Sequence, residues 1–291
     1  MKTWPNAVAS SAAAGYVTCS SCGLVYDATP RDEAGHAAFH ANQYAGDETQ
    51  LIPDRLHKLD PEHARRRQFS VAYQEWARDL LGELRDMLPP ERRAGTRFVD
   101  VGCASGGVVK AARDAGMVAA GTEVSVEAAT YGIEREGLDL RIGMLEDLNL
   151  PEASFDIVFL HDVIEHVPSP MNLLKSCARI LAPGGVICVH TVNVDSWTAA
   201  TAKDKFFLAD TTGGHTVLFS PATLRRYNTS AGLETVSVTT RGFRIVQRER
   251  DRDKMRGFKR AAIRLAENIG HELVKPLGKG HFVMVIGRKG S

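Results

Sequence analysis

The sequence has few cysteines, almost no net charge and no long apolar run. Its five cysteines are odd in number and lie mostly inside apolar segments, which argues against a disulfide framework and favours a reduced, cytoplasmic setting. A formal net charge of +1 gives no general attraction to nucleic acid, so no nucleic-acid partner is expected. No stretch approaches the roughly 18 to 20 apolar residues of a membrane span, and the N-terminus lacks the apolar core of a signal peptide.

Two parts of unequal length are expected along the 291 residues. Residues 1–58 are predicted to form an irregular N-terminal extension. Residues 59–291 are predicted to form the main domain, which opens with a helix from Asp60, the N-cap, to Met87. Apolar residues recur three or four positions apart in this helix: Phe69, Tyr73, Trp76, Leu80, Leu84 and Met87.

From residue 97 onward, strand patterns alternate with helix patterns. The predicted strands are residues 97–102, 118–123, 140–143, 155–160, 186–192, 233–245 and 280–289. The predicted helices are residues 106–116, 125–136, 169–185 and 220–232, with a helical insertion at 245–280 before the last strand. Strands separated by helices of this length indicate an α/β fold with a parallel, doubly wound sheet.

The main ligand signal is the strand–turn–helix segment FVDVGCASGGVV, residues 98–109. Gly102 and Gly106 let the backbone turn tightly and approach a ligand at the start of the following helix. Asp100 places a carboxylate beside this turn, which suits an ammonium group better than a phosphate. The next strand ends at Glu123, where an acid can accept both hydroxyls of a ribose. S-adenosylmethionine, with an amino-acid end and a nucleoside end, fits both carboxylates.

Other interpretations of this turn stay open at this point. Gly102-x-Ala104-x-x-Gly107 is a degraded dinucleotide-binding motif, which would indicate an oxidoreductase; Ala104 counts against it, because the backbone must come closest to the pyrophosphate there. A non-catalytic module that keeps a nucleoside pocket is a further alternative, and so is a tight turn without any ligand.

Five segments, in this order, resemble class I S-adenosylmethionine-dependent methyltransferases: FVDVGCASGG, GTEVSVEAATYG, LEDLNLPEASFDIVFLHDVIEHVPSP, LLKSCARILAPGGVICVHTVN and HTVLFSPATLRRY. The chain looks most similar to the group related to ubiquinone and menaquinone biosynthesis and to methyltransferases of bacterial glycans and secondary metabolites. The resemblance implies a Rossmann-like sheet of seven strands in the order 3-2-1-4-5-7-6, with the last inserted strand antiparallel. It also implies methyl transfer to a small-molecule or glycan acceptor, with oxygen favoured over carbon or nitrogen.

The resemblance further implies which residues bind the cofactor: Asp100, Gly102, Cys103, Ala104, Gly106, Glu123, Val124, Met144, Leu145 and His161. Asp100 and Gly102 are expected near the methionine moiety, and Glu123 on the ribose hydroxyls. Met144 stands where many relatives carry an aspartate for the adenine amino group. Adenine is therefore expected to meet the Leu145 backbone and apolar side chains instead.

FLHDVIEHVPSP, residues 159–170, places four ionisable side chains directly after the fourth strand. His161 and Asp162 are expected in the cofactor crevice, because ligands lie beyond the carboxyl ends of the strands in such sheets. Glu165 and His166 are expected at the acceptor rim, where they either orient a loop or take part in catalysis. His161, His166 and, on a glycine-rich loop, His215 are the candidate bases for an acceptor hydroxyl. A divalent metal held by His161, Glu165 and His166 is a weaker alternative.

The pair Cys19-x-x-Cys22 is a separate candidate for metal binding. Together with His36 and His40 it satisfies the C-x2-C…H-x3-H spacing of a zinc site. In the resembling group such a pair commonly closes a zinc ribbon, whose earlier cysteine pair is absent here. A degenerate ribbon without metal is therefore favoured, and zinc stays open.

A basic segment, residues 241–264, carries ten Lys and Arg residues against three Asp and Glu residues. An amphipathic helix with a solvated basic face is the favoured interpretation. Its position before the last strand also suits a role in dimerisation or in covering the acceptor site. The sequence thus predicts a cytoplasmic methyltransferase, with homodimer formation left open.

Overall fold

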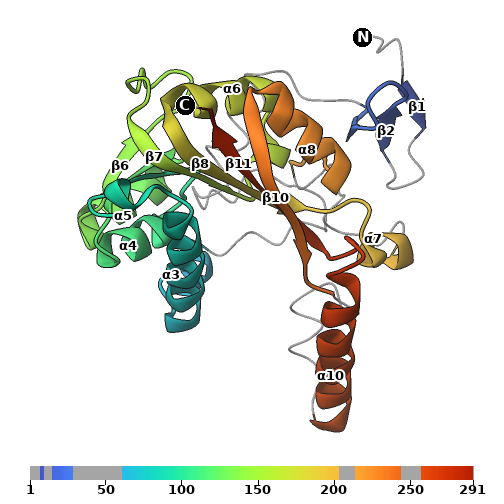
Figure 1. Cartoon of the computed structure of the whole chain (residues 1–291). Helices are drawn as coiled ribbons and strands as arrows, with labels where there is room; N and C mark the ends of the chain where they lie inside the picture. Colours follow the sequence, from blue (N-terminus) through green and yellow to red (C-terminus); the bar gives the residue numbers. More distant parts are fainter. Residues whose placement is uncertain (1–6, 10–14, 29–60, 203–213, 244–256, 291) are drawn as a thin grey trace.

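The computed structural model describes residues 7–9, 15–28, 61–202, 214–243 and 257–290, and a seven-stranded sheet forms its body (Figure 1). The strands are β4 (Arg97–Val101), β5 (Val118–Glu123), β6 (Asp139–Ile142), β7 (Phe155–His161), β8 (Leu181–Val192), β10 (Leu233–Arg241) and β11 (Phe282–Lys289). Their order across the sheet is β10-β11-β8-β7-β4-β5-β6. The pairs from β6 to β8 are parallel, and β11 is antiparallel to both β8 and β10. The predicted Rossmann-like fold and its order 3-2-1-4-5-7-6 are confirmed.

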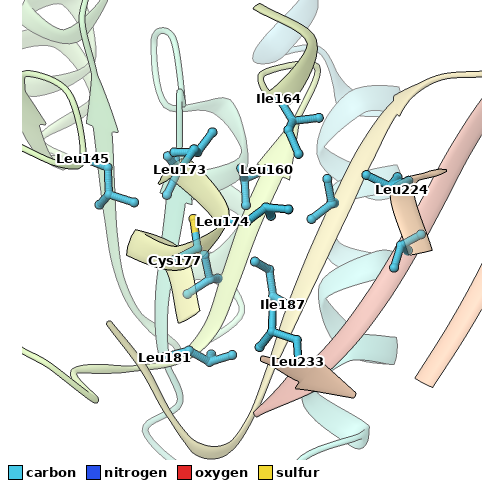
Figure 2. Packing of buried hydrophobic residues seen from close by; sticks show 14 of the residues in the cluster. Leu145, Leu160, Ile164, Leu173, Leu174, Cys177, Leu181, Ile187, Leu224 and Leu233 are labelled. Carbon is cyan, nitrogen blue, oxygen red and sulfur yellow. The ribbon is translucent and has the colours of Figure 1, made fainter. Parts of the chain in front are cut away.

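Helices cover both faces of this sheet (Figure 1). They are α3 (Val71–Asp86), α4 (Gly107–Asp114), α5 (Val126–Glu136), α6 (Pro170–Ile180) and α8 (Pro221–Ser230). The side chains of β7 alternate between the faces, so Ile157 and Phe159 join the core under α3 and α4. Val158 and Leu160 join the core under α6 and α8 instead. Figure 2 shows Leu160 in this core. A strand buried on both faces is apolar throughout, which explains the run that the sequence shows here.

The first predicted helix, residues 60–87, is in fact two helices. α2 (Pro61–Gln68) ends, and α3 begins anew with Ser70 as its N-cap, whose hydroxyl accepts a hydrogen bond from the Tyr73 N–H. The Gln74 amide donates to the carbonyls of Gln68 and Gly107, at 2.8 and 2.9 Å. The break between the two helices is therefore fixed onto the start of α4.

The predicted helix at residues 169–185 also ends early. α6 stops at Ile180, and β8 begins at once with Leu181, whose backbone is paired with Phe155 of β7. Pro183 lacks the N–H that a longer helix would need, and Leu181 is fully buried in the sheet. Residues 181–185, which the sequence pattern assigned to a helix, are thus part of strand β8.

Part of the N-terminal extension is regular, although irregular chain was expected. It contains three strands, β1 (Ala7–Ala9), β2 (Tyr16–Cys19) and β3 (Val25–Asp27). They form an antiparallel sheet with β9 (Val217–Leu218) of the main domain. The Tyr16 hydroxyl donates to the carbonyl of His215 at 3.0 Å, so these strands support the loop that carries His215. The predicted boundary at residues 58/59 lies outside the described residues.

The described part of the helical insertion is α10 (Gly257–Val274), which projects from the body (Figure 1). Leu265, Ile269 and Leu273, spaced four residues apart, are each more than half exposed; we name these three residues the α10 stripe. The short elements are η1 (Pro90–Arg92), η2 (Ile164–His166) and α7 (Trp197–Ala202). Among the helices in the described ranges, none is long and apolar enough to cross a membrane.

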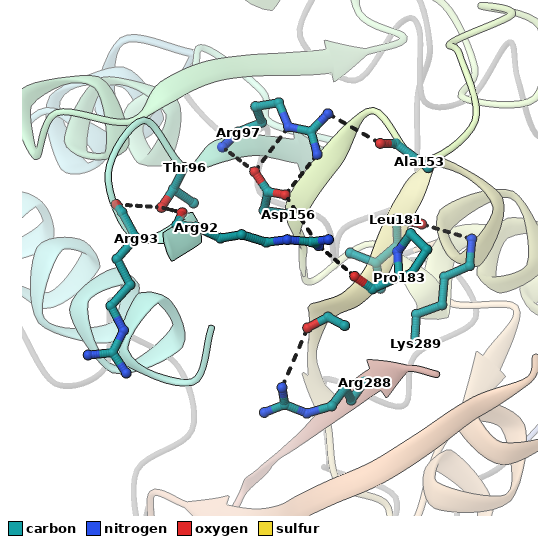
Figure 3. Close-up of polar contacts among 11 residues, drawn as sticks. Arg92, Arg93, Thr96, Arg97, Ala153, Asp156, Leu181, Pro183, Arg288 and Lys289 are labelled. Carbon is teal, nitrogen blue, oxygen red and sulfur yellow. Dashed lines mark hydrogen bonds and ion pairs between the residues drawn. The ribbon is translucent and has the colours of Figure 1, made fainter. Parts of the chain in front are cut away.

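An ion pair closes the amino ends of β4 and β7 (Figure 3). The buried Asp156 carboxylate accepts hydrogen bonds from the Arg97 backbone N–H, Nε and Nη2, at 2.9, 3.0 and 2.8 Å. Burial alone would raise the pKa of Asp156, but the hydrogen bonds and charge of Arg97 outweigh it and hold that pKa below its usual value. The two central strands are thereby tied together at the end opposite the candidate site.

Candidate functional site

A glycine turn connects β4 to α4 at the carboxyl end of the sheet. Gly102, Ala104 and Gly106 all have positive φ angles, of 74°, 49° and 84°. A Cβ on Gly102 would lie 2.5 Å from a methyl carbon of Val163, and one on Gly106 would lie 2.5 Å from a methyl carbon of Leu138. Glycine is favoured at both positions by the positive φ angles, and at Gly102 also by the contact with Val163, since the loop after β7 lies directly on the turn.

Glu123, at the end of β5, holds this turn in place. Its carboxylate accepts hydrogen bonds from the backbone N–H groups of Ala104 and Ser125, at 2.8 and 2.7 Å. These bonds stabilise the left-handed conformation of Ala104, which is unfavourable for a residue with a side chain. Burial raises the pKa of Glu123. Each carboxylate oxygen has a second lone pair, which can accept a ribose hydroxyl.

Asp100 lies next to Glu123, on the neighbouring strand. Its side chain is buried, and burial followed by repulsion from Glu123 raises its pKa well above the usual value. Two enclosed carboxylates at adjacent strand ends favour a ligand that brings positive charge and hydroxyl donors. The two carboxylates and the glycine turn therefore fit S-adenosylmethionine.

The other predicted cofactor residues are placed less directly. The Cys103 thiol packs against Gly121, because a Cβ there would lie 2.6 Å from its sulfur. The Leu145 side chain belongs to the core under α6, so only its backbone is available to adenine (Figure 2). Val124 and Met144 are half-buried at the same edge of the sheet.

A strand-end cluster, which we define as His161, Asp162 and His190, lies at the carboxyl ends of β7 and β8. His161 and His190 are paired across the two strands, and their rings are 4.6 Å apart. Asp162 Oδ1 lies 3.2 Å from His190 Nδ1, and Oδ2 lies 3.7 Å from His161 Nε2. Burial lowers the pKa of His161 to about 4, so its ring is neutral at physiological pH. The Asp162 side chain is 47% exposed, and the two histidines hold its pKa far below the usual value.

A rim cluster, which we define as Glu165, His166 and His215, lies beside it. The rings of His166 and His215 are 4.5 Å apart. Glu165 is 1% exposed; burial, followed by repulsion from Asp162, raises its pKa to about 8. Thr216 donates its N–H to the Glu165 carbonyl at 2.7 Å, which joins the loop after β7 to the loop before β9. All three rim residues were predicted as catalytic, and the structure brings them together.

Each cluster could hold a metal ion, since its ligand atoms lie within 4.8 Å of one another. These are the two sets of this kind among the described residues. The combination proposed from the sequence, His161 with Glu165 and His166, is not one of them, because His161 groups with Asp162 and His190. Residues close in sequence are thus divided between two sites.

Cys19 and Cys22 lie at the tip of the β2–β3 hairpin, where both are half-buried and their thiols are hydrogen-bonded to each other. Neither metal-holding set of the described residues includes them. His36 and His40 lie outside the described residues. The described chain therefore offers two thiol ligands here, which does not support a four-ligand zinc site.

Sequence reasoning missed His190, Tyr73 and Trp76. These side chains join a row of half-buried rings, which we call the ring row and which continues through His161 to Phe282. Successive ring centroids are 5.1, 5.0, 4.6 and 4.9 Å apart along Tyr73, Trp76, His161, His190 and Phe282. His190 lies two residues before the end of β8, inside a mostly apolar strand pattern that gave no sign of its role. Tyr73 and Trp76 had been assigned only to the buried face of a helix.

The sheet order, the glycine turn and the paired carboxylates define a class I S-adenosylmethionine-dependent methyltransferase. Residues 73–238, more than half of the chain, match the family described as methyltransferase domain. The chain belongs to this methyltransferase domain family and is an enzyme that uses S-adenosylmethionine. This assignment decides against the dinucleotide oxidoreductase and against the non-catalytic module.

Two curated relatives are named ubiquinone biosynthesis O-methyltransferase. The one from Thiobacillus denitrificans is 30% identical over 157 residues, which cover 50% of this chain and 68% of the relative. The one from Idiomarina loihiensis is 30% identical over 155 residues, which cover 50% of this chain and 64% of the relative. The alignments therefore leave out a sizeable part of each relative.

Solved structures share the fold at lower identity. A methyltransferase from Thermotoga maritima has a TM-score of 0.52 and 22% identity, and the match covers 79% of this chain and 96% of that chain. Phospholethanolamine N-methyltransferase 2 of Haemonchus contortus, solved with S-adenosylhomocysteine, has a TM-score of 0.56 and 16% identity, covering 79% and 57%. These likenesses establish the fold alone.

Proposed function

We propose that the protein transfers a methyl group from S-adenosylmethionine to a hydroxyl oxygen of a small molecule. The observation that carries this proposal is the strand-end cluster, which lies at the carboxyl ends of β7 and β8, next to the glycine turn. A hydroxyl must lose its proton when its oxygen is methylated, and histidine is suited to accept it near neutral pH. A neutral amine nitrogen can attack the methyl group before it loses a proton, whereas a hydroxyl oxygen is a weak nucleophile until its proton is removed. The names of the curated relatives also favour oxygen.

The cofactor would be held by the residues around the glycine turn. When bound, S-adenosylmethionine supplies a methyl group made electrophilic by a positively charged sulfur. We assign Asp100 to its ammonium end, Glu123 to its ribose hydroxyls, and Gly102 to the close approach of the backbone. The Leu145 backbone is assigned to adenine. Holding the acceptor about 3 to 3.5 Å from the methyl carbon in this enclosed site would supply much of the rate.

The acceptor would lie along the ring row. These five half-buried rings form an aromatic surface, and a further ring can pack against it in a tilted or offset arrangement. An aromatic hydroxyl is thus the favoured acceptor, and a glycan is the second candidate.

The rim cluster would bind the acceptor from the other side. Glu165, protonated up to about pH 8, can donate a hydrogen bond from its carboxyl group, and its Oε2 has no hydrogen-bond partner among the described residues. We assign Glu165, His166 and His215 to orienting the acceptor. His161, which is neutral and lies beside the glycine turn, is assigned to the wall between the cofactor and the acceptor.

We also propose that the α10 stripe pairs two copies of the chain. Leu265 and Leu273 are placed symmetrically about Ile269, so two stripes laid antiparallel would meet residue for residue, as a two-fold interface requires.

The proposed reaction is tested with cofactor carrying an isotope-labelled methyl group. The purified full chain is incubated with catechol, a neutral oligosaccharide and a primary amine, each in turn, and products are examined by mass spectrometry and NMR. We expect the label on a catechol oxygen and none with Glu123→Ala, which lacks the ribose acceptor. Label found only on the amine nitrogen, on carbon or on the oligosaccharide would contradict the proposal.

A further inference from the structure

We propose that His190 is the base that takes the proton from the acceptor hydroxyl, and that Asp162 positions it. This inference rests on the proposed function, because a base of this kind is needed when oxygen is the methylated atom. It assigns the proton to a residue outside the set that the sequence indicated, and it gives Asp162 a separate task.

The backbone of Asp162 is folded back onto His190. Asp162 has a φ of 56°, in the left-handed region, which few non-glycine residues adopt and which Asp adopts more readily than most. In this conformation its N–H donates to the His190 carbonyl at 3.0 Å, while its Oδ1 lies 3.2 Å from His190 Nδ1. The main chain and the side chain of one residue thus bind the same histidine. Two contacts from one residue fix the position of the His190 side chain relative to the end of β7.

This contact fixes which ring nitrogen is available. Asp162 is ionised across the physiological range, so it accepts a hydrogen bond and His190 must carry its proton on Nδ1. Nε2 then has a free lone pair. Among the described residues, none forms a hydrogen bond with His190 Nε2. This atom is also not one of the fully enclosed polar atoms, so a ligand can reach it. Nε2 is therefore the atom that can meet an acceptor.

His161 is less suited to the task. Its ring is enclosed by Trp76, whose centroid is 5.0 Å away, and its Nδ1 lies 3.5 Å from the Tyr73 hydroxyl. Burial lowers its pKa to about 4, which makes its ring a weak base. The His161 ring packs beside the His190 ring, so we assign it to positioning His190 and not to accepting the proton.

The proposed step conserves atoms and charge. The acceptor O–H proton moves to His190 Nε2 while the acceptor oxygen forms a bond to the methyl carbon. The bond between sulfur and that carbon breaks, and its electron pair goes to sulfur, which becomes neutral. The products are the methyl ether, S-adenosylhomocysteine and a positively charged His190, which the Asp162 carboxylate stabilises until the proton passes to water.

The test compares His190→Gln, Asp162→Asn and the wild-type chain, with catechol as the acceptor. We expect kcat to fall by about 100-fold or more in His190→Gln, and by at least about tenfold in Asp162→Asn. The dissociation constant of S-adenosylhomocysteine should stay within about threefold, which shows that the variants are folded. Asp139→Asn is the matched control, because Asp139 is exposed at the start of β6, at the opposite end of the sheet. This control should retain wild-type kcat.

A second measurement needs no acceptor. NMR of protein with ¹⁵N-labelled histidine can assign the His190 signal as the one that is absent in His190→Gln. In the wild type, this signal should show the Nδ1–H tautomer. The same signal should change tautomer or become a mixture in Asp162→Asn. A wild-type ring protonated on Nε2 would overturn the inference, and so would a ring that does not respond to Asp162→Asn.

The remaining outcomes separate the two proposals. Oxygen methylation by the wild type with more than a tenth of kcat left in His190→Gln would overturn the role of His190 and leave the proposed function standing. Methylation of nitrogen or carbon alone would overturn both. Activity that is lost with a chelator and restored by a divalent metal, together with a metal-induced shift of the His190 signals, would make His190 a ligand and overturn its role as base.

Discussion

Replacing Asp156 with alanine should destabilise the fold by about 3 kcal/mol without changing the cofactor site. The carboxylate accepts three hydrogen bonds from Arg97, one from the backbone and two from the guanidinium. A hydrogen bond to a charged group contributes about 1.5 to 3 kcal/mol. The Arg97 side chain is 42% exposed, so water replaces its two bonds in the variant and each is discounted to below about 1 kcal/mol. The backbone N–H retains the larger value, which gives the sum of about 3 kcal/mol.

The effect should depend on pH in a defined direction. Because Arg97 holds the folded-state pKa of Asp156 below the unfolded value, the pair stabilises the protein above that unfolded value. This contribution is lost as the pH falls through the lower, folded-state pKa. The difference between the wild type and Asp156→Ala should therefore be largest near neutral pH and shrink below about pH 4.

Urea unfolding and calorimetry measure the difference directly. For a domain of this size, about 3 kcal/mol corresponds to a fall in Tm of roughly 6 to 12 °C. Arg66→Ala is the control, because its ion pair with Glu62 is exposed on both sides and should contribute less than about 0.5 kcal/mol. A loss below about 1 kcal/mol in Asp156→Ala, or an equal loss in the control, would refute the reasoning.

Three further predictions concern the cofactor site, the rim cluster and the α10 stripe. In Glu123→Gln, the amide N–H₂ would face one of the two backbone N–H groups that the carboxylate now binds. S-adenosylhomocysteine should therefore bind at least about tenfold more weakly, as measured by calorimetry. Unchanged affinity would remove Glu123 from the cofactor site. Glu165 has a folded-state pKa of about 8, above its unfolded value, so the stability of the wild type should decline between about pH 5 and 8. In Glu165→Gln the decline in Tm over this range should be smaller. An equal decline in the variant would contradict a protonated Glu165 in the rim cluster. Ile269→Glu should convert a dimer to a monomer in light scattering, whereas a wild-type monomer at high concentration would exclude pairing through the stripe.

Much of the sheet followed from local patterns. The strands β4, β5 and β7 are each followed by a helix of regular length, so the α/β class could be derived directly, and the resemblance supplied the strand order. The break at Ser70 could not be derived, because the apolar spacing on either side of it suits one continuous helix. Its cause is a contact between Gln74 and Gly107, which are far apart in the sequence. The β2–β3 hairpin was missed for a similar reason, since its partner β9 is a two-residue strand.

The candidate site was predictable where chemistry is carried by neighbouring residues. Gly102, Asp100 and Glu123 lie at the ends of adjacent strands, and the structure places them together as expected. His190 could not be singled out, because a strand pattern does not show which residue lies across from His161. The division of the FLHDVIEHVPSP segment into two clusters accompanies a turn of the chain at Asp162, whose φ is positive, between His161 and Glu165. Side-chain spacing alone carries no information about such a reversal.

The hydrogen bond between Tyr16 and His215 joins residues that are 199 positions apart. Contacts of such separation form late, because a long loop must close before they bring any gain. The glycine turn and Glu123, by contrast, are 19 positions apart and can assemble early. During synthesis the N-terminal hairpin emerges first, yet it can pair only after β9 has left the ribosome. We therefore expect the cofactor side of the enzyme to form before the loop that carries His215.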